Sequence, residues 1–345
     1  MDLPPPPPQA QVDAGRLRDM IMGFRVTQML YVAATLNLPG HLIDGPQSAE
    51  EIAARVGADS TSLHRLMRSL TSLGILAEAG GGRFSVTALG RLLAPDAPNS
   101  LAGLAILYGD EWLWKAYGRM LHSVRTGETA FAQVHGKALF EFLDTHPDAA
   151  AQFQAAMNAY SRLEVSALLD AYTFPEGATV IDVGGGHGTL LAALLTAHPS
   201  ITGVLFDQPA VVANAERVFA DARVRSRATA VGGDFFSELP SRGDLYLLKS
   251  VLHNWPDRDA GRILQCCRRA MSPRARLLIA ERIVPLGNTP SEAKLFDINM
   301  LVVLGGKERT EDEYQELLGS AGFSLVQVIA TKSPLSLIEA QPRVD

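Results

Sequence analysis

Cysteine is nearly absent from this sequence: only Cys266 and Cys267 occur among 345 residues, and they are neighbours. Adjacent cysteines cannot form an ordinary structural disulfide with each other. A chain without disulfides is typical of a reducing compartment, so we expect a cytoplasmic protein. The sequence also lacks an apolar run of membrane-spanning length and a basic segment followed by an apolar one at its start, so neither a membrane span nor a secretory signal is predicted.

A positive net charge is also missing, because 31 lysines and arginines stand against 37 aspartates and glutamates, for a formal net charge of −6. Proteins that bind nucleic acids or anionic membranes through charge carry basic patches. The composition therefore argues against both kinds of partner. Hydrophobic residues at 47% and charged residues at 20% are typical of a soluble globular protein. The length exceeds one typical hydrophobic core, so we expect two domains.

The most informative stretch is residues 179–189, TVIDVGGGHGT, where a short apolar run contains Asp182 and breaks into four glycines within five residues. An apolar helical pattern follows at residues 190–197. Strand, glycine loop and helix in this order form the first unit of a doubly wound α/β sheet, which binds ligands beyond the carboxyl ends of its strands. Glycines let a ligand approach the backbone, and the start of the helix offers free N–H groups to an anion.

The spacing of the glycines distinguishes between nucleotide ligands. A dinucleotide fingerprint needs G-x-G-x-x-G/A, but counting from Gly184 the third position is Thr189. The pattern that is present, D-x-G-x-G-x-G from Asp182 through Gly184 and Gly186 to Gly188, resembles the first motif of S-adenosylmethionine-dependent methyltransferases. The ammonium group of that ligand suits Asp182, and its carboxylate suits the helix terminus. A glycine-rich turn that binds no ligand is the alternative.

The amino-terminal part reads as a tail followed by a long helix. Five prolines at positions 4–8 predict a disordered, linker-like tail over residues 1–13. Residues 14–36 carry apolar side chains at helical spacing around much of the helix circumference, so another surface must cover them. We expect this helix to pack across a two-fold axis in a homodimer.

Residues 47–94 predict helix, turn, helix and a glycine-tipped hairpin, which is the outline of a winged helix. Ser48 and Glu51 form a capping box for the first helix, and Asp59 or Ser60 caps the second. DNA binding is one interpretation. However, the segment holds five arginines and four carboxylates, a net charge of about +1, whereas a DNA reader is expected to neutralise several phosphates. A structural or dimerising role is therefore favoured.

The helical pattern continues over residues 100–172 and is rich in aromatic side chains. The aromatic cluster consists of Trp112, Trp114, Tyr117, Phe131, Phe140 and Phe142. The last helix before the glycine loop adds Phe153, Met157 and Tyr160. These side chains form plain core, or they line a pocket for a flat substrate, since aromatic and methionine surfaces suit such a pocket. Both interpretations stay open.

Four further apolar strand patterns follow the glycine loop, and a charged residue stands at the carboxyl end of each. The strands and these residues are 201–206 with Asp207, 228–231 with Asp234, 244–248 with Lys249, and 276–280 with Glu281. Ligands of doubly wound sheets bind at the carboxyl ends of the strands, so these residues are expected to surround one site. We expect Asp207 to accept from ribose hydroxyls and Asp234 from an adenine amino group, while Phe235 packs on the adenine ring.

Five segments together carry a family resemblance. They are DVGGGHG at 182–188, GGDFF at 232–236, LHNW at 252–255, IAER at 279–282 and GGKERT at 305–310. The chain resembles the S-adenosylmethionine-dependent O-methyltransferases of the plant caffeic-acid type, a family that includes bacterial polyketide and aromatic natural-product enzymes and acetylserotonin methyltransferase. The resemblance covers nearly the whole chain after the proline tail. It implies a mostly α-helical winged-helix dimerisation and substrate-lid domain over residues 14–165 and a Rossmann-like doubly wound methyltransferase domain over residues 166–345.

The resemblance also implies roles for particular residues. The catalytic base would be His253, flanked by Glu281 and Glu308. The expected cofactor contacts are Asp182, Gly184, Gly186, Asp207, Asp234, Phe235 and Lys249, and the expected substrate contacts are Phe153, Met157, Met300 and Asn254. The family usually has aspartate after the histidine, whereas Asn254 stands here, so substrate contacts inferred from that aspartate are open.

The expected reaction is O-methylation of a small aromatic or polyketide-type natural product. A histidine with a pKa near 6.5 can take the proton of a phenol as the oxygen attacks, and two glutamates can fix the imidazole tautomer and stabilise the imidazolium. The sequence shows no metal-ligand cluster, so no metal is expected. The first alternative keeps fold and cofactor but performs hydroxylation, decarboxylation or a pericyclic reaction. The second is a ligand-responsive DNA-binding regulator.

Overall fold

The computed structural model describes residues 9–343, whose contacts group into two units. The first unit runs to Trp114 and includes His146–Ala159, and the second consists of Lys115–Thr145 and the chain from Tyr160 onward. Helix α12 (Pro147–Ala171) contributes to both, and the predicted domain boundary after residue 165 falls inside this continuous helix. Residues 1–8 of the tail predicted over residues 1–13 lie outside the described residues, and residues 9–13 form the start of α1.

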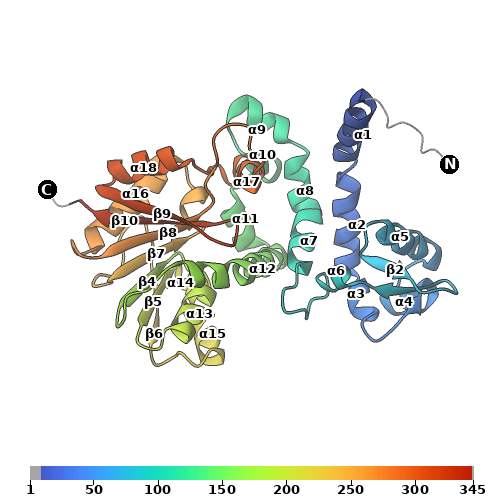
Figure 1. Ribbon diagram of the computed structural model, residues 1–345, viewed down its shortest axis with the longest axis horizontal. Coiled ribbons are helices and arrows are strands. Elements are labelled where there is room, and N and C mark those ends of the chain that lie inside the picture. Colours follow the sequence, from blue (N-terminus) through green and yellow to red (C-terminus); the bar gives the residue numbers. More distant parts are fainter. Residues whose placement is uncertain (1–8, 344–345) are drawn as a thin grey trace, which may run out of the picture. The chain divides into compact units, whose positions relative to one another are not determined.

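The first unit contains helices and one small antiparallel sheet of order β1-β3-β2 (Figure 1). Its elements are α1 (Gln9–Ile21), α2 (Phe24–Thr35), α3 (Leu38–His41), β1 (Gln47–Ser48), α4 (Ala49–Val56), α5 (Ser60–Ser72), β2 (Leu76–Glu78), β3 (Arg83–Val86), α6 (Ala88–Arg91), α7 (Ala102–Gly109) and the start of α8 (Glu111–Tyr117). The predicted capping box of Ser48 and Glu51 is confirmed, and the Asp59 carboxylate accepts from the N–H of Ser62 at 2.8 Å. Helix, turn, helix and hairpin therefore form where the sequence predicts them.

The prediction of one unbroken helix over residues 14–36 is wrong. The chain turns at Met22 and Gly23, which separate α1 from α2, and α1 already begins at Gln9. Glycine costs about 1 kcal/mol in a helix interior relative to alanine, so Gly23 is a natural place for the break. Large apolar side chains on both sides of this turn are exposed in the single chain: Leu17, Met20, Ile21 and Phe24.

A seven-stranded sheet forms the centre of the second unit, with strand order β6-β5-β4-β7-β8-β10-β9. The strands are β4 (Thr179–Val183), β5 (Thr202–Asp207), β6 (Ala228–Gly232), β7 (Leu245–Lys249), β8 (Arg276–Glu281), β9 (Phe323–Ala330) and β10 (Ser336–Pro342). Strands β4 to β8 are parallel to one another, and β10 runs antiparallel to both β8 and β9. The predicted doubly wound fold is confirmed, and the sequence analysis did not anticipate β9 and β10.

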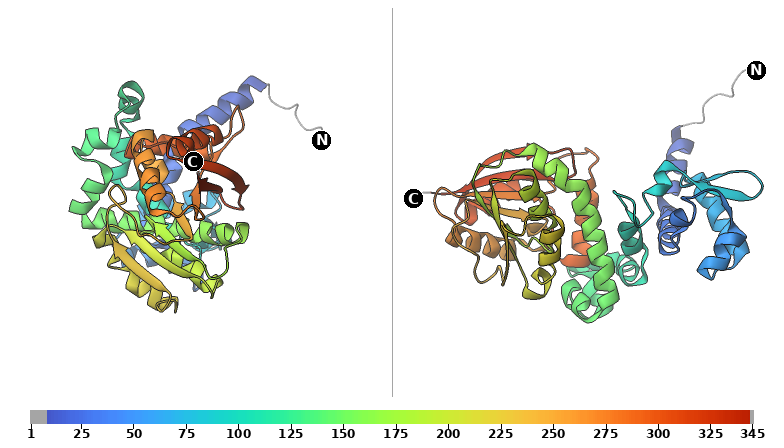
Figure 2. Two further views of the ribbon diagram at one scale, coloured as in Figure 1. Left: turned by 90° about the vertical axis from the view of Figure 1, so that its left-hand side faces the viewer. Right: turned by 90° about the horizontal axis from the view of Figure 1, so that it is seen from below.

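Helices cover both faces of this sheet (Figure 2). They are the end of α12, α13 (Thr189–Ala197), α14 (Pro209–Val212), α15 (Ala215–Asp221), α16 (Asp257–Ala270) and α18 (Glu311–Ser320). The unit also contains α9 (Met120–Thr126), α10 (Ala130–His135), α11 (Leu139–Thr145), α17 (Glu292–Asn299), a 3-10 turn η1 (Leu252–Asn254) and a π-helix η2 (Met300–Leu304). One core packs α16 and α18 on the sheet, and the other packs α12, α13 and α15. Among the described residues, no helix combines the length and apolar character needed to cross a bilayer.

Candidate active site

The glycine loop and three charged residues meet at the carboxyl ends of adjacent parallel strands. Asp182 lies on β4, Asp207 ends β5 and Lys249 ends β7, with β4 between the other two. The Gly184 N–H donates to a β5 carbonyl at 2.7 Å, and the Gly186 N–H donates to Asp207 Oδ2 at 2.8 Å. The strand patterns thus place these residues together at the carboxyl ends of the parallel strands, a region named the cofactor edge.

Glycine is required in this loop because the backbone adopts left-handed conformations. The φ angles of Gly184, Gly186 and Gly188 are 69°, 61° and 81°. A Cβ on Gly184 would also collide with the Val251 side chain at 2.8 Å, whereas a Cβ on Gly186 would meet no described atom within 4 Å. The backbone at Gly186 is therefore open to the approach of a ligand.

Asp182 is buried, and neither of its carboxylate oxygens has a hydrogen-bond partner among the described residues. Burial raises the pKa of Asp182 to about 7, although the cation of Lys249 lowers it and the carboxylate of Asp207 raises it further. Proteins rarely leave a buried carboxylate unpaired, because the charge loses its hydration. An ammonium group beside the glycine loop would compensate for this cost. The residues of the cofactor edge therefore fit the amino-acid end of S-adenosylmethionine.

Asp207 is partly buried and is held by the backbone. Its two carboxylate oxygens accept from the N–H groups of Gly186 at 2.8 Å and Gln208 at 2.7 Å. Burial raises the pKa of Asp207, and these two N–H donors oppose the rise. Each oxygen retains a lone pair that can accept a second hydrogen bond. Binding of ribose hydroxyls by Asp207 stays a prediction that this geometry permits.

Asp234 and Phe235 differ in their surroundings. Asp234 is exposed, and its carboxylate accepts from the Phe236 N–H at 2.9 Å and from the Ser237 hydroxyl at 3.0 Å. The Phe235 ring lies beside the glycine loop, since a Cβ on Gly184 would be 3.7 Å from it. Phe235 therefore lies beside the glycine loop, whereas both carboxylate oxygens of Asp234 already accept hydrogen bonds within its own turn. Their adenine contacts stay predictions.

The Lys249 ammonium forms an ion pair with Glu164, a residue that the sequence analysis did not single out. Lys249 Nζ lies 3.2 Å from Glu164 Oε2, and the Glu164 side chain is almost completely buried. Glu164 comes from α12 and stands among apolar residues, which is the signal that could have identified it. A buried carboxylate normally has a charged partner. Lys249 is therefore held at the cofactor edge by a helix that precedes the sheet.

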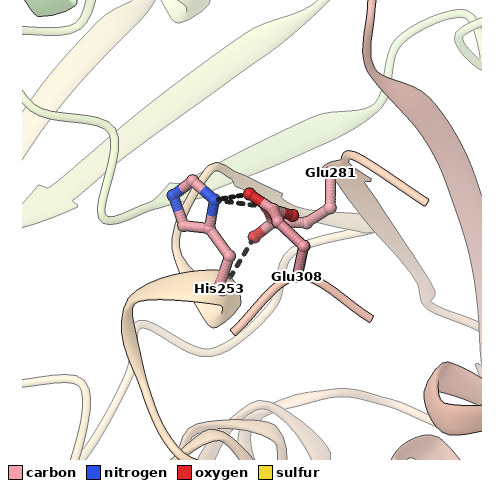
Figure 3. Close-up of side chains that lie close together, drawn as sticks. All are labelled: His253, Glu281 and Glu308. Carbon is pink, nitrogen blue, oxygen red and sulfur yellow. Dashed lines mark hydrogen bonds and ion pairs between the residues drawn. The ribbon is translucent and has the colours of Figure 1, made fainter. Parts of the chain in front are cut away.

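The buried imidazole of His253 faces the carboxylates of two glutamates with one nitrogen, Nδ1 (Figure 3). Its Nδ1 is 2.7 Å from Glu308 Oε1 and 3.4 Å from Glu281 Oε2. The other oxygen of Glu281, Oε1, accepts from three consecutive backbone N–H groups, at 2.9 Å from Val251, 2.9 Å from Leu252 and 3.3 Å from His253. Glu281 therefore fixes the backbone of η1 and also approaches the ring that this turn carries.

The two glutamates determine the protonation of His253. Burial alone lowers the pKa of this imidazole, but the carboxylates of Glu281 and Glu308 raise it more, and Arg282 opposes them. The net pKa is above the ordinary histidine value. With a carboxylate at Nδ1, the proton of the neutral ring is held on Nδ1 and Nε2 carries the lone pair. Among the described residues, Nε2 has no hydrogen-bond partner.

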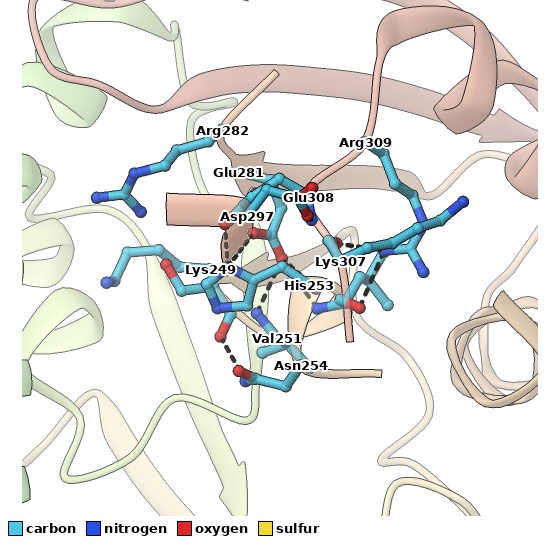
Figure 4. A network of polar contacts seen from close by, with 12 residues as sticks. Lys249, Val251, His253, Asn254, Glu281, Arg282, Asp297, Lys307, Glu308 and Arg309 are labelled. Carbon is cyan, nitrogen blue, oxygen red and sulfur yellow. Dashed lines mark hydrogen bonds and ion pairs between the residues drawn. The ribbon is translucent and has the colours of Figure 1, made fainter. Parts of the chain in front are cut away.

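Arg309, labelled in Figure 4, also supports the turn that carries His253, as does Gly306, and no role was predicted for either residue. The fully buried Arg309 guanidinium donates to the carbonyl oxygens of Leu252 at 3.1 Å and Trp255 at 2.9 Å. A Cβ on Gly306 would collide with the carbonyl of His253. The GGKERT segment therefore packs directly against the LHNW segment, which explains why both motifs occur together.

The expected substrate contacts do not form one described group. Met300 is buried at the start of η2, and Asn254 Nδ2 donates to the Ser250 carbonyl at 3.1 Å within its own turn. Phe153 and Met157 belong to the part of α12 in the first unit. All four stay predictions. Within the aromatic cluster, Phe131 and Phe142 are buried core, whereas Phe140 is 42% exposed.

His253, Glu281 and Glu308 also meet a geometric requirement for a metal site, which the sequence did not suggest. One ligand atom from each lies within 4.8 Å of the others. However, Glu281 Oε1 accepts three N–H groups and Glu308 Oε1 bonds the imidazole, so both carboxylates already stabilise the turn. This use of the oxygens favours a base with two supporting carboxylates.

A glycine loop at the carboxyl edge of a doubly wound sheet, beside an unpaired buried carboxylate, defines the class of Rossmann-like methyltransferases. The chain belongs to the O-methyltransferase family. Residues 117–324 match the O-methyltransferase domain, and residues 19–96 match the O-methyltransferase dimerisation domain. The prediction of an S-adenosylmethionine-dependent O-methyltransferase is confirmed.

Bacterial natural-product enzymes are among its relatives. The chain is 43% identical to phenazine O-methyltransferase PhzM of Lysobacter antibioticus, covering 94% of this chain and 95% of PhzM. The crystal structure of LaPhzM superposes with a TM-score of 0.92 at 43% identity, covering 96% of this chain and 99% of that one. NcsB1 from neocarzinostatin biosynthesis, solved with S-adenosylmethionine and 2-hydroxy-5-methyl naphthoic acid, gives 0.79 at 31% identity over 92% and 96%. Aclacinomycin 10-hydroxylase RdmB of Streptomyces purpurascens is 38% identical over 88% and 83%.

Proposed function

We propose that this enzyme methylates a hydroxyl of a small aromatic or polyketide-type natural product, with His253 as general base. The observation that carries the proposal is the buried imidazole of His253, held through Nδ1 by Glu308 and Glu281. The relatives support the substrate class, since one is a phenazine O-methyltransferase and another was solved with a hydroxynaphthoic acid.

The geometry suits proton transfer from a phenol. Glu308 holds the Nδ1 proton, so the lone pair on Nε2 is available to an acceptor hydroxyl. When Nε2 takes that proton, the imidazolium is stabilised by two carboxylates that are already in place. A positioned general base contributes on the order of 10²–10⁴-fold to the rate. Because the pKa of His253 is raised, the neutral imidazole prevails only above its ordinary titration range, so turnover should rise with pH there.

The cofactor edge supplies the second requirement, a fixed methyl donor. Bound S-adenosylmethionine provides an electrophilic methyl group on a sulfonium. Asp182 would compensate its ammonium group, the Gly186 backbone would allow close approach, and Asp207 would accept from its ribose hydroxyls. Methyl transfer is an in-line displacement, so holding donor and acceptor in fixed geometry supplies much of the rate. In this proposal Phe153, Met157, Met300 and Asn254 contact the acceptor.

The first unit would serve assembly. Residues 19–96 match a dimerisation domain, and α1 and α2 carry exposed Leu17, Met20, Ile21 and Phe24. A second copy would cover these side chains and remove apolar surface from water. Light scattering on the full chain should give twice 37.1 kDa. A monomer at micromolar concentration would contradict the proposed homodimer. We retain the cytoplasm as the expected compartment, because both cysteines are unpaired thiols.

A methyl-transfer assay tests the proposed activity. The full chain is incubated with S-adenosylmethionine and a panel of phenols, hydroxynaphthoates and hydroxyphenazines, and product mass is measured. The proposal predicts products that gain one methyl group in place of a hydrogen atom. His253→Ala, which retains the cofactor edge, is the matched control, and it should convert the same acceptors far more slowly.

The kinship to RdmB supports a second candidate, hydroxylation on the same fold. When the assay also contains dioxygen as oxidant and a two-electron reductant such as a thiol, this chemistry would add one oxygen atom from dioxygen, with the other released as water, so product mass separates the two reactions. The intact arrangement of His253, Glu281 and Glu308 favours methylation, because a base with carboxylate support serves the deprotonation of a hydroxyl.

A further inference from the structure

Arg282 is a buried cation beside the His253 centre that the proposed reaction has not yet used. It follows Glu281 directly at the end of β8, and only 2% of it is exposed. Its Nη2 lies 3.5 Å from Glu164 Oε1 and 3.4 Å from Glu292 Oε1. Glu164 is shared with Lys249 of the cofactor edge. A buried guanidinium is costly unless it is paired, so its position needs a reason.

The guanidinium also packs on aromatic rings. It lies 4.1 Å from the centroid of the Phe296 ring and 5.7 Å from that of Tyr160. The two rings meet edge to face, with centroids 6.0 Å apart and planes at 87°. Stacking on an aromatic face uses the planar guanidinium in a way that a lysine ammonium cannot reproduce. Arg282 is therefore fixed by ring contacts as well as by ion pairs.

Two of the Arg282 partners lie on α17, one helical turn apart. Glu292 and Phe296 are four residues apart and therefore share one face of the helix. The same helix contacts the base centre through consecutive residues. The Phe296 ring stacks on the His253 ring at 6.0 Å and 18°, and Asp297 Oδ1 accepts from the Glu308 N–H at 2.8 Å. One cation thus holds the helix that touches both His253 and Glu308.

We propose that Arg282 is a positioning residue of the methyl-transfer reaction, which holds α17 through Glu292 and Phe296 and thereby fixes His253 and Glu308. This inference rests on the proposed function of His253. Arg282 acts through Phe296 and α17 and does not itself touch the acceptor. Without Arg282, α17 loses the contacts of Glu292 and Phe296 with the guanidinium. The Phe296 ring, against which the His253 ring stacks, is then no longer fixed.

The charge of Arg282 has a second, measurable effect on the base. The groups that act on the His253 ring are the carboxylates of Glu281 and Glu308, which raise its pKa, and the Arg282 cation, which lowers it. Behind them, Arg309 and Tyr314 act on Glu281, and Asp297 contacts Glu308. Removing only the Arg282 cation should therefore shift the titration of His253 upward, and the acidic limb of the kcat profile should move to higher pH.

The test compares Arg282→Met, Arg282→Lys and a matched control, Arg276→Met, at the opposite end of the same strand. Arg282→Met should lower kcat by roughly 10-fold or more and move the acidic limb upward by about half to one pH unit. Arg282→Lys should return the acidic limb of the kcat profile to its wild-type pH, because lysine keeps the charge. It should not restore the full kcat, because lysine lacks the planar group that stacks on the ring. Arg276→Met should leave both unchanged.

An unchanged kcat and an unchanged limb in Arg282→Met would overturn the inference. If Arg282→Met does not fold, Glu292→Gln carries the test, because the Glu292 side chain is 54% exposed and its loss removes one of the two holds on α17. A several-fold lower kcat with intact binding of S-adenosylhomocysteine supports the inference, and wild-type kcat overturns it. His253→Ala in the same assays separates the questions, since wild-type turnover in that variant would contradict the proposed base and not the role of α17.

Discussion

The His253 centre and the cofactor edge both bury carboxylates, but they pair them differently. At the His253 centre, Glu281 Oε1 accepts three backbone N–H groups, and Glu308 Oε1 bonds the imidazole. At the cofactor edge, Asp182 is equally buried and has no hydrogen-bond partner among the described residues. Each glutamate keeps one oxygen without a hydrogen bond, whereas Asp182 has two.

This difference shows which part of the site the chain completes by itself. The His253 turn is fixed by Glu281, Arg309 and the close approach of Gly306, all of which belong to the protein. The buried charge of Asp182 has one cation of the described chain acting on it, Lys249, which does not bond to it directly. Full compensation requires a positively charged group of a ligand. Folding therefore fixes the His253 turn in advance, whereas the buried charge of Asp182 would be compensated only when the ammonium group of a ligand binds.

The largest expected effect comes from removing the base. His253→Ala should lower kcat by about 10²–10⁴-fold, because general-base help is expressed in the transition state, while affinity for S-adenosylmethionine stays near wild type. Steady-state kinetics and calorimetry on the same preparation measure both quantities. His64→Ala in the first unit is the control for histidine loss and should leave kcat unchanged.

Glu308→Gln tests how strongly Glu308 supports His253. The amide keeps a hydrogen-bonding group near Nδ1 but removes a charge that stabilises the imidazolium, so the loss should be smaller than in His253→Ala. The double variant should cost far less than the product of the single losses, because the residues act as one unit. Independent, multiplicative losses would mean that Glu308 does not support His253.

Asp207→Ala should weaken binding of S-adenosylmethionine by about 1–3 kcal/mol, because charge-assisted hydrogen bonds to the ribose are lost. Calorimetry measures this directly. Asp244→Ala is the matched control, since Asp244 precedes β7 at the amino end of the strand and accepts from Thr179 N–H. Equal affinities of Asp207→Ala and wild type would refute the ribose assignment.

Asp182→Asn should change stability and cofactor affinity in opposite directions. The folded pKa of about 7 lies above the ordinary aspartate value of 3.8, so the folded state binds the extra proton and wild-type stability falls as pH rises between these values. At pH 8 the amide should raise the free energy of unfolding of the cofactor-free protein by at most about 4 kcal/mol and weaken cofactor binding about tenfold. Thermal unfolding with and without S-adenosylhomocysteine checks both; parallel changes would show that Asp182 does not bind the ligand.

The smallest expected effect is that of metal removal. Although His253, Glu281 and Glu308 lie close enough to hold an ion, one oxygen of each glutamate and Nδ1 of His253 are already used within the turn. Dialysis against a chelator should leave turnover unchanged. Loss of activity that zinc or magnesium restores would convert the proposed base centre into a metal site.

Part of this site could be predicted from the sequence because several of its charged residues lie at the carboxyl ends of strands. Asp182, Asp207 and Lys249 could be placed together from the periodicity of parallel strands alone. His253 and Glu308 could be assigned to one site only from the family resemblance, since 54 residues lie between them and neither belongs to a regular strand. The structure supplies the reason for their meeting, the packing of Gly306 against the His253 turn.

Other features had no usable local signal. Arg282 and Glu164 look like ordinary charged residues in the sequence, and only their burial and mutual contact reveal a network. The break at Gly23 was missed because apolar spacing continues on both sides of it. Strand β10 pairs with both β8 and β9, and this pairing depends on contacts between distant parts of the chain that no local pattern contains.

Rescue of His253→Ala by acidic phenols tests the central claim most directly. Matched acceptors that differ in hydroxyl pKa are compared in wild type and in His253→Ala by single-turnover methylation. If His253 takes the proton, the variant should lose much less rate with an acidic phenol, which ionises without help, than with an ordinary one. An equal loss for both acceptors would contradict the account, because His253 would then position the substrate and methylation would rest on proximity alone.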